Sequence, residues 1–411
     1  MQKPDAETVQ RITRRGVAEI IVESEFVRLL DEGRPLRLKM GFDPSRPDLH
    51  LGHVVGLRKL QQLQELGHQV VLIVGDWTAQ IGDPSEQSDT RTMLSADEVK
   101  ANAETYMRQF FKVIDRGRTE VRQQSEWFGA FTLGTVFELT AKFTVNQFLH
   151  RDDFAQRYEA NQPVAVTELL YPLLQAYDSV EVKADVEFGG TDQKFNLLVG
   201  RELQEKMGQR PQQCFLMPIL PGTDGVRRMG KSLGNYIALE DPPDEMFGKT
   251  MSLPDAVLPT YFELLTDVPE AKLAEVRLAV ERGGAGAMEL KKRLAREMVA
   301  WFHSAEAARK AEATFGRVVQ RDDAPENVPE FVVQEATQGV KALGDEVVAV
   351  DLRQFLSTAG LAASSSEARR LLIHGAVKID GQRAVQEPST EIRFGSVIKV
   401  GARRYVRVVK G

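Results

Sequence analysis

Two short segments of the chain hold residues that suit the binding of a triphosphate. The first runs from Gly41–Pro44 (Gly-Phe-Asp-Pro) into His50–His53 (His-Leu-Gly-His), and the second, about 175 residues later, is Arg228–Ser232 (Arg-Met-Gly-Lys-Ser). If a helix begins at His50, its free backbone N–H groups and the positive end of its dipole face an anion there. A lysine on a mobile loop supplies charge where pyrophosphate develops. Together the segments predict adenylyl transfer from ATP.

The residue types of the first segment fit this chemistry. Gly41 and Gly52 leave room where backbone must approach a ligand closely. His50 and His53, one turn apart, can share a helix face and donate hydrogen bonds to phosphate. Other nucleotidyltransferases use the same turn, so it indicates adenylyl transfer and no particular acceptor. The basic loop alone could equally be a solvated turn. It indicates a phosphate site only in combination with the two histidines that precede it in the sequence.

The elements that must position these segments alternate between strands and helices over the first two-thirds of the chain. We expect strands at residues 36–42, 70–74, near 121, 186–188 and 215–220. We expect helices at residues 8–30, 51–66, 95–114, 133–149, 167–177 and 192–207. This alternation predicts a doubly wound, parallel-sheet (Rossmann-like) α/β domain with its ligand beyond the carboxyl ends of the strands. The motif residues fall at those ends.

Composition restricts the class of protein. A chain of 411 residues with 42% hydrophobic residues predicts several domains with buried cores. It has no apolar run of about 18 residues and no apolar N-terminal signal, so we expect a cytoplasmic protein without membrane contact. The single cysteine, Cys214, excludes an internal disulfide framework and a cysteine-rich metal site. We expect Cys214 to pack in a core and the protein to hold no metal site of its own.

The charge is distributed unevenly along the chain. From Asp351 to Gly411 the sequence has 11 Lys and Arg against 5 Asp and Glu, a net +6, whereas the whole chain carries −6. The rest of the chain therefore carries −12. A basic module on an acidic body is expected when that module contacts a polyanion such as RNA. The alternative is a basic domain that binds nothing.

Four further segments resemble those of bacterial tyrosyl-tRNA synthetases, which are class I aminoacyl-tRNA synthetases. These are residues 41–45, 75–84, 171–178 and 189–193. They match in order and spacing, and the likeness spans nearly the whole chain. On a helix, Tyr171, Gln175 and Asp178 fall on one face. The resemblance implies that this face holds both ends of an amino acid.

The resemblance assigns Asp178 to the phenolic hydroxyl of L-tyrosine. A partly buried carboxylate accepts that O–H strongly, and phenylalanine would leave the acceptor unpaired. Rejection of phenylalanine in this way is established behaviour of the family. The family pattern implies that the tyrosine site consists of Lys39, Gly41, Asp43, Thr78, Asp83, Tyr171, Gln175, Asp178 and Gln193.

The resemblance also implies how ATP, as its Mg²⁺ complex, is held. The catalytic residues would be His50, His53, Arg228, Lys231 and Ser232. Further ATP contacts would come from Ser45, Gly52, Gly190 and Asp192. The carboxylate of tyrosine would attack the α-phosphorus, and a tRNA ribose hydroxyl would then attack the tyrosyl-adenylate. Catalysis of this kind rests on positioning and electrostatic stabilisation and needs no side-chain nucleophile.

Some residues depart from the family pattern. Glu86 and Gln87 stand where many members have glycine and a basic residue, which leaves Arg91 as the nearby cation. In the basic loop, Arg228 and Gly230 replace the usual lysine and serine; Arg228 keeps the charge and Gly230 loosens the loop. One branch of the family has a tyrosine at the position of Lys39, so the part of Lys39 in phenol recognition stays open.

The resemblance predicts the domains. Residues 1–240 form the catalytic domain, with an aromatic insertion at about 125–165 that forms a homodimer interface. Residues 241–320 form a helical domain that binds the anticodon stem, and residues 321–349 form a linker. Residues 350–411 are similar to the RNA-binding module named after ribosomal small-subunit protein four. Its candidate contacts to tRNA(Tyr) are Arg369, Arg370 and Lys378.

The sequence thus favours a tyrosine–tRNA ligase, an ATP-dependent enzyme of protein biosynthesis. One alternative is an RNA-binding protein on a synthetase scaffold that has lost aminoacylation, which Glu86, Gln87 and Gly230 alone support. Another is a sibling enzyme for a different amino acid, which Asp178 and the C-terminal module disfavour.

Overall fold

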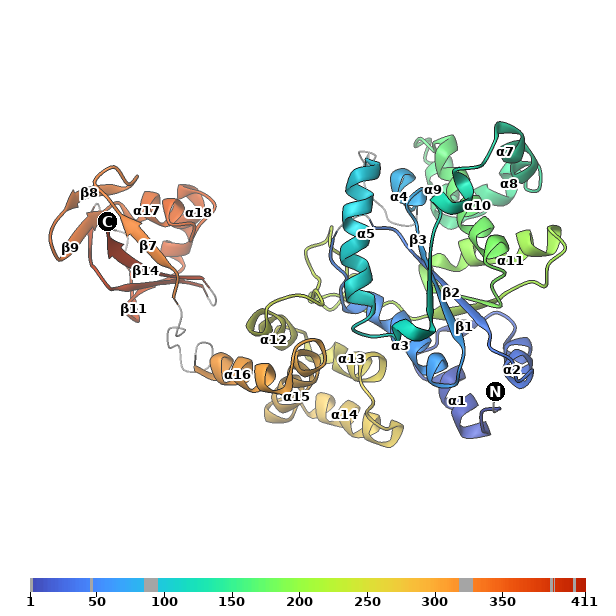
Figure 1. Ribbon diagram of the computed structural model, residues 1–411. Coiled ribbons are helices and arrows are strands. Elements are labelled where there is room, and N and C mark those ends of the chain that lie inside the picture. The colour runs from blue at the N-terminus through green and yellow to red at the C-terminus, as the bar shows by residue number, and fades with distance from the viewer. Residues whose placement is uncertain are drawn as a thin grey trace. The chain divides into compact units, whose positions relative to one another are not determined.

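The chain folds into two compact units, which divide between Ser304 and Ala305. The computed structural model describes residues 3–44, 47–84, 95–317, 328–384, 387, 389–401 and 404–411 (Figure 1). Each unit is described by itself below. Among the described helices, none combines the length and the apolar character needed to cross a bilayer.

A six-stranded sheet forms the centre of the first unit. Its strands are β1 (Glu19–Ile20), β2 (Arg37–Phe42), β3 (Gln69–Val74), β4 (Thr119–Gln123), β5 (Val186–Gly190) and β6 (Gln213–Met217). The order is β1-β6-β5-β2-β3-β4, with β1 antiparallel to β6 and the other strands parallel. Strands β3 and β6 are buried almost throughout, as expected for parallel strands covered on both faces. Cys214 of β6 is buried, and burial raises the pKa of its thiol to about 12, in line with a packing role.

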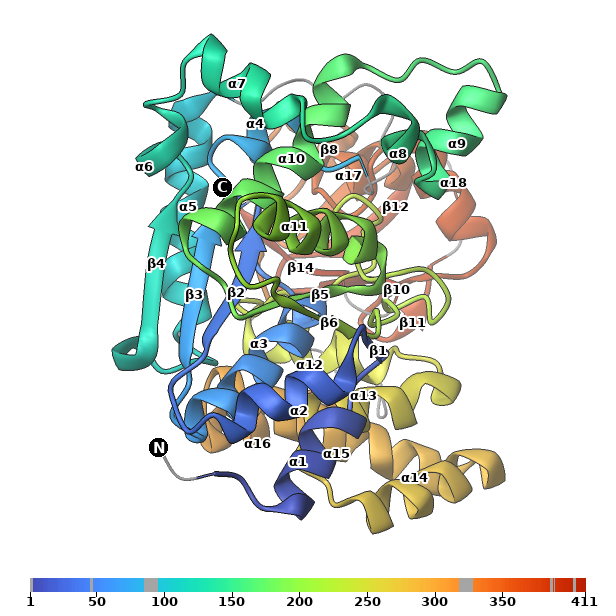
Figure 2. The same cartoon turned by 90° about the vertical axis from the view of Figure 1, so that its right-hand side faces the viewer.

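Helices cover both faces of this sheet. Helices α3 (Leu51–Glu65) and α5 (Ala96–Phe110) lie on one face, and α10 (Val166–Glu181) and α11 (Lys194–Lys206) lie on the other (Figures 1 and 2). The chain builds β2, β3 and β4 outward in one direction, then returns to place β5 beside β2. The predicted doubly wound architecture is confirmed. Its topological switch point lies between β2 and β5, where such sheets bind ligands.

A buried ion pair joins the two strands at this switch point. Lys39 of β2 lies directly opposite Glu187 of β5 in the parallel register. Their charged atoms are 2.9 Å apart, and the side chains are 0% and 1% exposed. Lys39 Nζ also donates to the carbonyl of Gln175 and to Ser179 Oγ, each at 2.7 Å. The pair therefore fixes α10 against the sheet as well as joining two strands.

Two of the expected helices are interrupted. Residues 8–30 form α1 (Ala6–Arg14) and α2 (Glu23–Asp31), with β1 between them. Gly16 has a φ of +63°, which ends the helical path, and the chain then pairs with β6. Residues 133–149 form α7 (Leu133–Thr140) and α8 (Val145–Leu149), because Thr144 caps a new helix by exchanging hydrogen bonds with Gln147. The prediction of continuous helices was wrong at both places.

Shorter helices complete the first unit. Near the sheet these are α4 (Thr78–Ile81), α6 (Ser125–Phe128), α9 (Asp152–Glu159) and the 3₁₀ turns η1 (Arg116–Arg118) and η2 (Thr191–Gln193). After the sheet come α12 (Pro243–Met251), η3 (Asp255–Val257), α13 (Leu258–Leu265), α14 (Glu270–Arg282) and α15 (Ala285–Phe302). Arg15 ties these helices to the N-terminal segment, because its guanidinium donates to the carbonyls of Glu263 and Thr266 at 3.1 and 2.7 Å.

The second unit is a small α+β structure. Its helices are α16 (Ala305–Phe315), α17 (Leu352–Thr358) and α18 (Ser365–Ile373). Its strands are β7 (Glu330–Val333), β8 (Val340–Leu343), β9 (Val347–Val350), β10 (Val377–Ile379), β11 (Gln382–Arg383), β12 (Thr390–Arg393), β13 (Val397–Val400) and β14 (Arg404–Lys410). They form a five-stranded sheet, β11-β10-β13-β14-β7, and a three-stranded sheet, β12-β9-β8. Phe355, Leu356 and Leu372 pack with Val377 and Ile398 in one hydrophobic core.

Candidate active site

A cavity of about 510 Å³ lies at the carboxyl ends of β2, β3, β5 and β6. Most of the residues that the sequence predicted for the two substrates line this cavity. These are Gly41, Asp43, His50, Gly52, His53, Thr78, Asp83, Tyr171, Gln175, Asp178, Gly190, Asp192, Gln193, Arg228, Lys231 and Ser232. Lys39 does not line it, because its ammonium group is enclosed by the ion pair and hydrogen bonds described above. Ser45, Glu86, Gln87 and Arg91 lie outside the described residues.

Asp178, on the face of α10 that lines the cavity, is a buried carboxylate with spare acceptor capacity. It is 2% exposed, and its Oδ2 accepts a hydrogen bond from Gln124 Nε2 at 2.9 Å. Its Oδ1 has no hydrogen-bond partner within the described part of the chain. Burial raises the pKa of Asp178 to about 7, against the opposing influence of Lys39 and the Gln124 hydrogen bond. The site therefore holds an acceptor that a hydroxyl donor would satisfy.

Gln124 is held in place by backbone groups. Its Oε1 accepts from the N–H groups of Trp77 and Thr78 at 3.2 and 3.0 Å, which leaves Nε2 to face Asp178. Gln124 was not among the residues predicted from the sequence. The available signal was its position directly after β4, since the carboxyl ends of parallel strands meet at the ligand.

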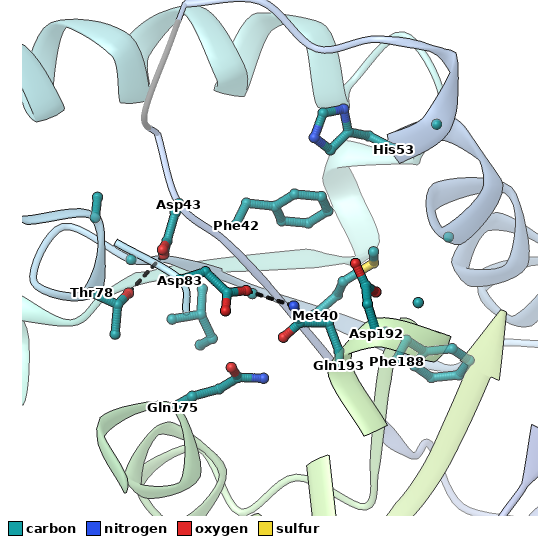
Figure 3. Close-up of a pocket in the computed structure, with 18 of the residues that line it drawn as sticks. Met40, Phe42, Asp43, His53, Thr78, Asp83, Gln175, Phe188, Asp192 and Gln193 are labelled. Carbon is teal, nitrogen blue, oxygen red and sulfur yellow. Dashed lines mark hydrogen bonds between the residues drawn. The ribbon is translucent and has the colours of Figure 1, made fainter. Parts of the chain in front are cut away.

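A second polar group surrounds Asp43 at the end of β2 (Figure 3). Tyr171 O–H donates to Asp43 Oδ2 at 2.9 Å, and Thr78 Oγ1 donates to Asp43 Oδ1 at 2.7 Å. Gly75 permits this arrangement, because a Cβ at that position would lie 2.2 Å from Asp43 Oδ1 and 2.4 Å from Thr78 Oγ1. The three side chains thus come from a strand end and two helices and share one carboxylate.

Two amides extend this polar wall of the cavity. Gln193 Nε2 donates to Asp83 Oδ2 at 2.6 Å, the bond that is dashed between these two side chains in Figure 3. Gln175 Nε2 donates to Glu187 Oε1 at 3.1 Å, so the buried ion pair beneath the cavity orients this amide. The result is a wall of carboxylate and amide oxygens, which suits a cationic group on a ligand.

His50 and His53 form a reciprocal cap at the start of α3. The N–H of Gly52 donates to His50 Nδ1, and the N–H of His50 donates to His53 Nδ1, each at 3.2 Å. In the neutral rings the proton therefore lies on Nε2. Burial, followed by the charges of His53, Lys231 and Arg228, holds the pKa of His50 well below its usual value. His50 is thus a neutral hydrogen-bond donor at pH 7.

Gly52 matters for this cap. A Cβ at position 52 would lie 2.9 Å from the His50 ring, so a larger residue would displace the imidazole. The two rings lie 4.0 Å apart between centroids and both line the cavity. The N–H groups of Leu51, Gly52 and His53 already donate to Ile237, to the His50 ring and to the His50 carbonyl. What this helix start offers an anion is therefore the two imidazole rings and the positive end of the helix dipole.

The basic loop reaches the same cavity from β6. Asn235 holds its base, because its Nδ2 donates to Asp224 Oδ2 and to the carbonyl of Arg228 at 2.9 and 3.0 Å. The Arg228 guanidinium lies 3.4 Å from Asp192 Oδ2. Lys231 Nζ donates to the hydroxyl of Tyr106 on α5 at 2.9 Å. Tyr106 also lines the cavity and was not anticipated, because no local motif marks it.

In the second unit, the predicted RNA contacts lie close together in sequence. Arg369 and Arg370 are exposed on α18, and Lys378 on β10 is half-buried. The α18 helix begins at an N-cap, Ser364, which accepts from the N–H of Glu367 at 3.2 Å. Two adjacent guanidinium groups on one exposed helix suit contacts to phosphate.

Two protein-family models match the chain, and the first of them extends past the division at Ser304 to include α16 of the second unit. The model of the family "tRNA synthetases class I (W and Y)" matches residues 31–320, and the model of the S4 domain matches residues 352–398. The first match covers strands β2 to β6 of the sheet, the cavity and the helices that follow, but not β1. The second covers α17, α18 and several strands of the second unit.

Curated relatives are similar along the whole chain. A tyrosine–tRNA ligase of Dehalococcoides mccartyi is 57% identical over 401 residues, which is 98% of each chain. One of Moorella thermoacetica is 50% identical over 404 residues, covering 97% of this chain and 95% of its own. Among solved structures, the tyrosyl-tRNA synthetase of Archaeoglobus fulgidus, complexed with L-tyrosine, is 25% identical with a TM-score of 0.61. That match covers 74% of this chain and 98% of the other.

Proposed function

The chain belongs to the tyrosine–tRNA ligases of class I, which use ATP as a substrate, and we propose which of its residues carry each part of the reaction. The relatives give no support to a scaffold protein without aminoacylation. The assignment starts from one observation, the unpaired Oδ1 of buried Asp178.

Asp178 recognises the hydroxyl of tyrosine. The phenolic O–H donates to Oδ1 while Gln124 keeps Oδ2 in place. Phenylalanine fills the same space but leaves a desolvated carboxylate without a donor, which costs more than the loss of one ordinary hydrogen bond. Selectivity thus arises from the acceptor and not from the size of the pocket.

The polar wall holds the other end of tyrosine. Tyr171, Gln175 and Asp83 contact the α-ammonium group, with Thr78 close by. Asp43 and Gln193 lie near the reacting carboxylate, and Gly41 leaves the space that the backbone of the substrate needs. Lys39 does not contact the substrate directly. It donates to the Gln175 carbonyl and to Glu187, and Glu187 in turn orients the Gln175 amide.

ATP lies between the start of α3 and the basic loop. His50 and His53 face the triphosphate, and Gly52 leaves room beside the His50 ring. Arg228, Lys231 and Ser232 approach it from the loop, while Gly190 and Asp192 meet the ribose. Ser45, at the end of β2, is assigned to ATP from the family pattern alone.

Mg²⁺ enters with ATP as part of the substrate complex. In the described part of the chain, no group of three or more His, Cys, Asp or Glu side chains is arranged to hold a metal ion. The ion instead neutralises phosphate charge on the nucleotide itself.

The residues around the cavity act by position and charge. With tyrosine and ATP aligned, the tyrosine carboxylate attacks the α-phosphorus, and pyrophosphate leaves toward Lys231 and Arg228. The imidazole Nε2–H groups and the two cations stabilise negative charge as it shifts onto the β-phosphate. A ribose hydroxyl of the terminal tRNA adenosine then attacks the tyrosyl carbonyl and releases AMP.

We propose the same domain roles as the sequence suggests. Residues 1–240 form the catalytic domain, 241–320 contact the anticodon stem, and 350–411 bind tRNA(Tyr) through Arg369, Arg370 and Lys378. The segment expected as a linker, 321–349, holds β7, β8 and most of β9, which belong to the two sheets of the second unit. The insertion at about 125–165 supports a homodimer, because large apolar side chains there are strongly exposed. These are Leu133, Phe137, Val145 and Tyr158, which are 59–68% exposed. We place the enzyme in the cytoplasm, where tRNA charging serves translation.

Calorimetric titration of the free enzyme with tyrosine and phenylalanine tests the assignment of Asp178. We expect wild type to bind tyrosine at least about 100-fold more tightly than phenylalanine, and Asp178→Asn to reduce this ratio to below about 10. The substitution keeps the shape of the side chain. Asp178→Ala removes the acceptor altogether, and an unchanged preference in that variant would show that another group reads the hydroxyl.

A further inference from the structure

Helix α5 contacts the segment that leads into the histidine pair. Asn102 Nδ2 donates to the carbonyl of Pro44 at 3.0 Å, and Thr105 Oγ1 donates to the carbonyl of Pro47 at 2.5 Å. Gln109 Oε1 accepts from the N–H of Leu49 at 2.7 Å, and its Nε2 donates to the carbonyl of Pro47 at 2.9 Å. These side chains lie on one face of the helix and fix the path of the chain just before His50.

The same helix also contacts the segment that contains the basic loop. The Tyr106 hydroxyl oxygen accepts from Lys231 Nζ, and Arg108 donates two hydrogen bonds of 3.0 and 2.6 Å to Glu240. Glu240 directly follows the chain that pairs with Leu49, through a bond from the N–H of Leu239 to the carbonyl of Leu49 at 3.0 Å. Helix α5 is therefore a common support for both triphosphate-binding segments.

Tyr106 is well fixed for contact with a mobile lysine. It is 3% exposed, and its ring packs edge-on against Phe110 with centroids 5.9 Å apart. Lys231 Nζ lies 5.0 Å from the ring centroid and 2.9 Å from the hydroxyl oxygen, so the two side chains meet through a hydrogen bond to the hydroxyl and not through the ring face. The lysine stem itself is flexible, and its neighbour Gly230 adds freedom to the loop.

We propose that Tyr106 is a positioning residue for Lys231 in amino-acid activation. Its hydroxyl oxygen accepts a hydrogen bond from the ammonium group and holds Nζ at the wall of the cavity that the triphosphate would occupy. Because the ammonium group is placed before the nucleotide reacts, less conformational entropy is lost in the transition state. The inference rests on the proposed assignment of Lys231 to the triphosphate.

The test removes the hydroxyl alone. In tyrosine-dependent ATP–pyrophosphate exchange, we expect Tyr106→Phe to lower kcat about 5- to 20-fold, the effect of losing one charge-assisted hydrogen bond. The KM for tyrosine and the thermal unfolding temperature should stay unchanged, because the ring and its packing remain. Tyr405→Phe is the matched control: it removes a hydroxyl from an 8%-exposed ring in the second unit where that hydroxyl has no partner in the described chain.

A double-mutant cycle separates positioning from a structural role. In the Lys231→Ala background, Tyr106→Phe should cause no further loss, because the lysine it positions is absent. An equal loss in both backgrounds, or wild-type exchange by Tyr106→Phe, would overturn the inference while Lys231→Ala remains defective. Wild-type exchange by Lys231→Ala would instead overturn the proposed assignment of Lys231 itself.

Discussion

Burial of Asp178 lowers the stability of the free protein and provides a hydrogen-bond acceptor for the ligand. A carboxylate that is 2% exposed loses most of its hydration, and only one of its oxygens has a hydrogen-bond partner in the described chain. Burial raises its pKa to about 7 from the ordinary 3.8. A group of this kind is typical of binding sites, where the missing donor is supplied by the substrate.

The raised pKa predicts how stability depends on pH. The folded chain holds a proton on Asp178 up to about pH 7, and the unfolded chain releases it near pH 3.8. The contribution of Asp178 to stability therefore falls as the pH rises through this window. We expect Asp178→Asn to be more stable than wild type at pH 8 by about 2–4 kcal/mol, an advantage that disappears near pH 4. Urea unfolding of both proteins at several pH values measures it.

Saturating tyrosine provides the control for this prediction. The ligand hydroxyl should stabilise the ionised carboxylate, so tyrosine should stabilise wild type at pH 8 far more than it stabilises Asp178→Asn. A stability difference that does not change between pH 4 and pH 8 would contradict the raised pKa of Asp178.

At the level of single residues, sequence could identify those that motifs mark. His50, His53 and Lys231 stand in recognisable segments, and the cavity contains them all. Gln124 and Tyr106 stand in no motif. Their importance depends on which backbone groups and which lysine come near them in space, and this is decided by packing over long separations in sequence.

The ion pair between Lys39 and Glu187 is the main link between elements at the site. It lies where β2, β5 and α10 meet, and it is fully enclosed. Gln212 Nε2 also donates to Glu187, and a Cβ on Gly200 would lie 3.1 Å from Glu187 Oε2. The surroundings are therefore fitted closely to this carboxylate.

Breaking this pair from one side should be costly. Lys39→Met leaves a buried, unpaired carboxylate, and we expect it to lower the free energy of unfolding by about 3–5 kcal/mol. Lys39→Met combined with Glu187→Gln removes both charges and should recover most of that loss. Guanidinium unfolding of the single and double variants measures the difference. Equal stability of the two variants would show that the charge on Glu187 is not the cause.

Helices and strands could be predicted from the sequence where the spacing of apolar residues indicates them. The strand at 70–74 and the helix at 51–66 appear as expected, because buried parallel strands and amphipathic helices leave clear signals. The strand expected at 215–220 is present but ends earlier, as β6 (Gln213–Met217). The breaks at Gly16 and Thr144 were missed. Apolar spacing continues through both, so the turn is specified by a single left-handed glycine or by a cap. The pairing of Lys39 with Glu187 could not be predicted either, because the order of the strands in the sheet decides which residues lie opposite each other on neighbouring strands.

The whole molecule combines a catalytic unit with a basic RNA-binding unit. The family match from residue 31 to 320 and the S4 match from 352 to 398 assign separate chemistry to each. The uneven charge along the sequence already indicated this division. What it could not indicate is which exposed cations meet RNA, because phosphate contacts depend on the shape of both surfaces.

The two units should respond separately to mutation. Arg369→Ala with Arg370→Ala should weaken tRNA(Tyr) binding by about 10-fold or more at moderate salt and flatten the dependence of affinity on salt, because fewer counterions are released. Tyrosine-dependent ATP–pyrophosphate exchange should not change, since it needs no tRNA. Filter binding across a salt series, with exchange assays in parallel, measures both. An unchanged salt slope would place the RNA contacts elsewhere.

The central claim is that the cavity activates tyrosine and selects it through Asp178. The most direct measurement is amino-acid-dependent ATP–pyrophosphate exchange with tyrosine and with phenylalanine, on wild type and on Asp178→Ala. We expect wild type to exchange with tyrosine alone, and the variant to lose that selectivity. Exchange that remains selective for tyrosine in Asp178→Ala would contradict the role of Asp178, and no exchange by wild type with either amino acid would contradict the account of the site as a whole.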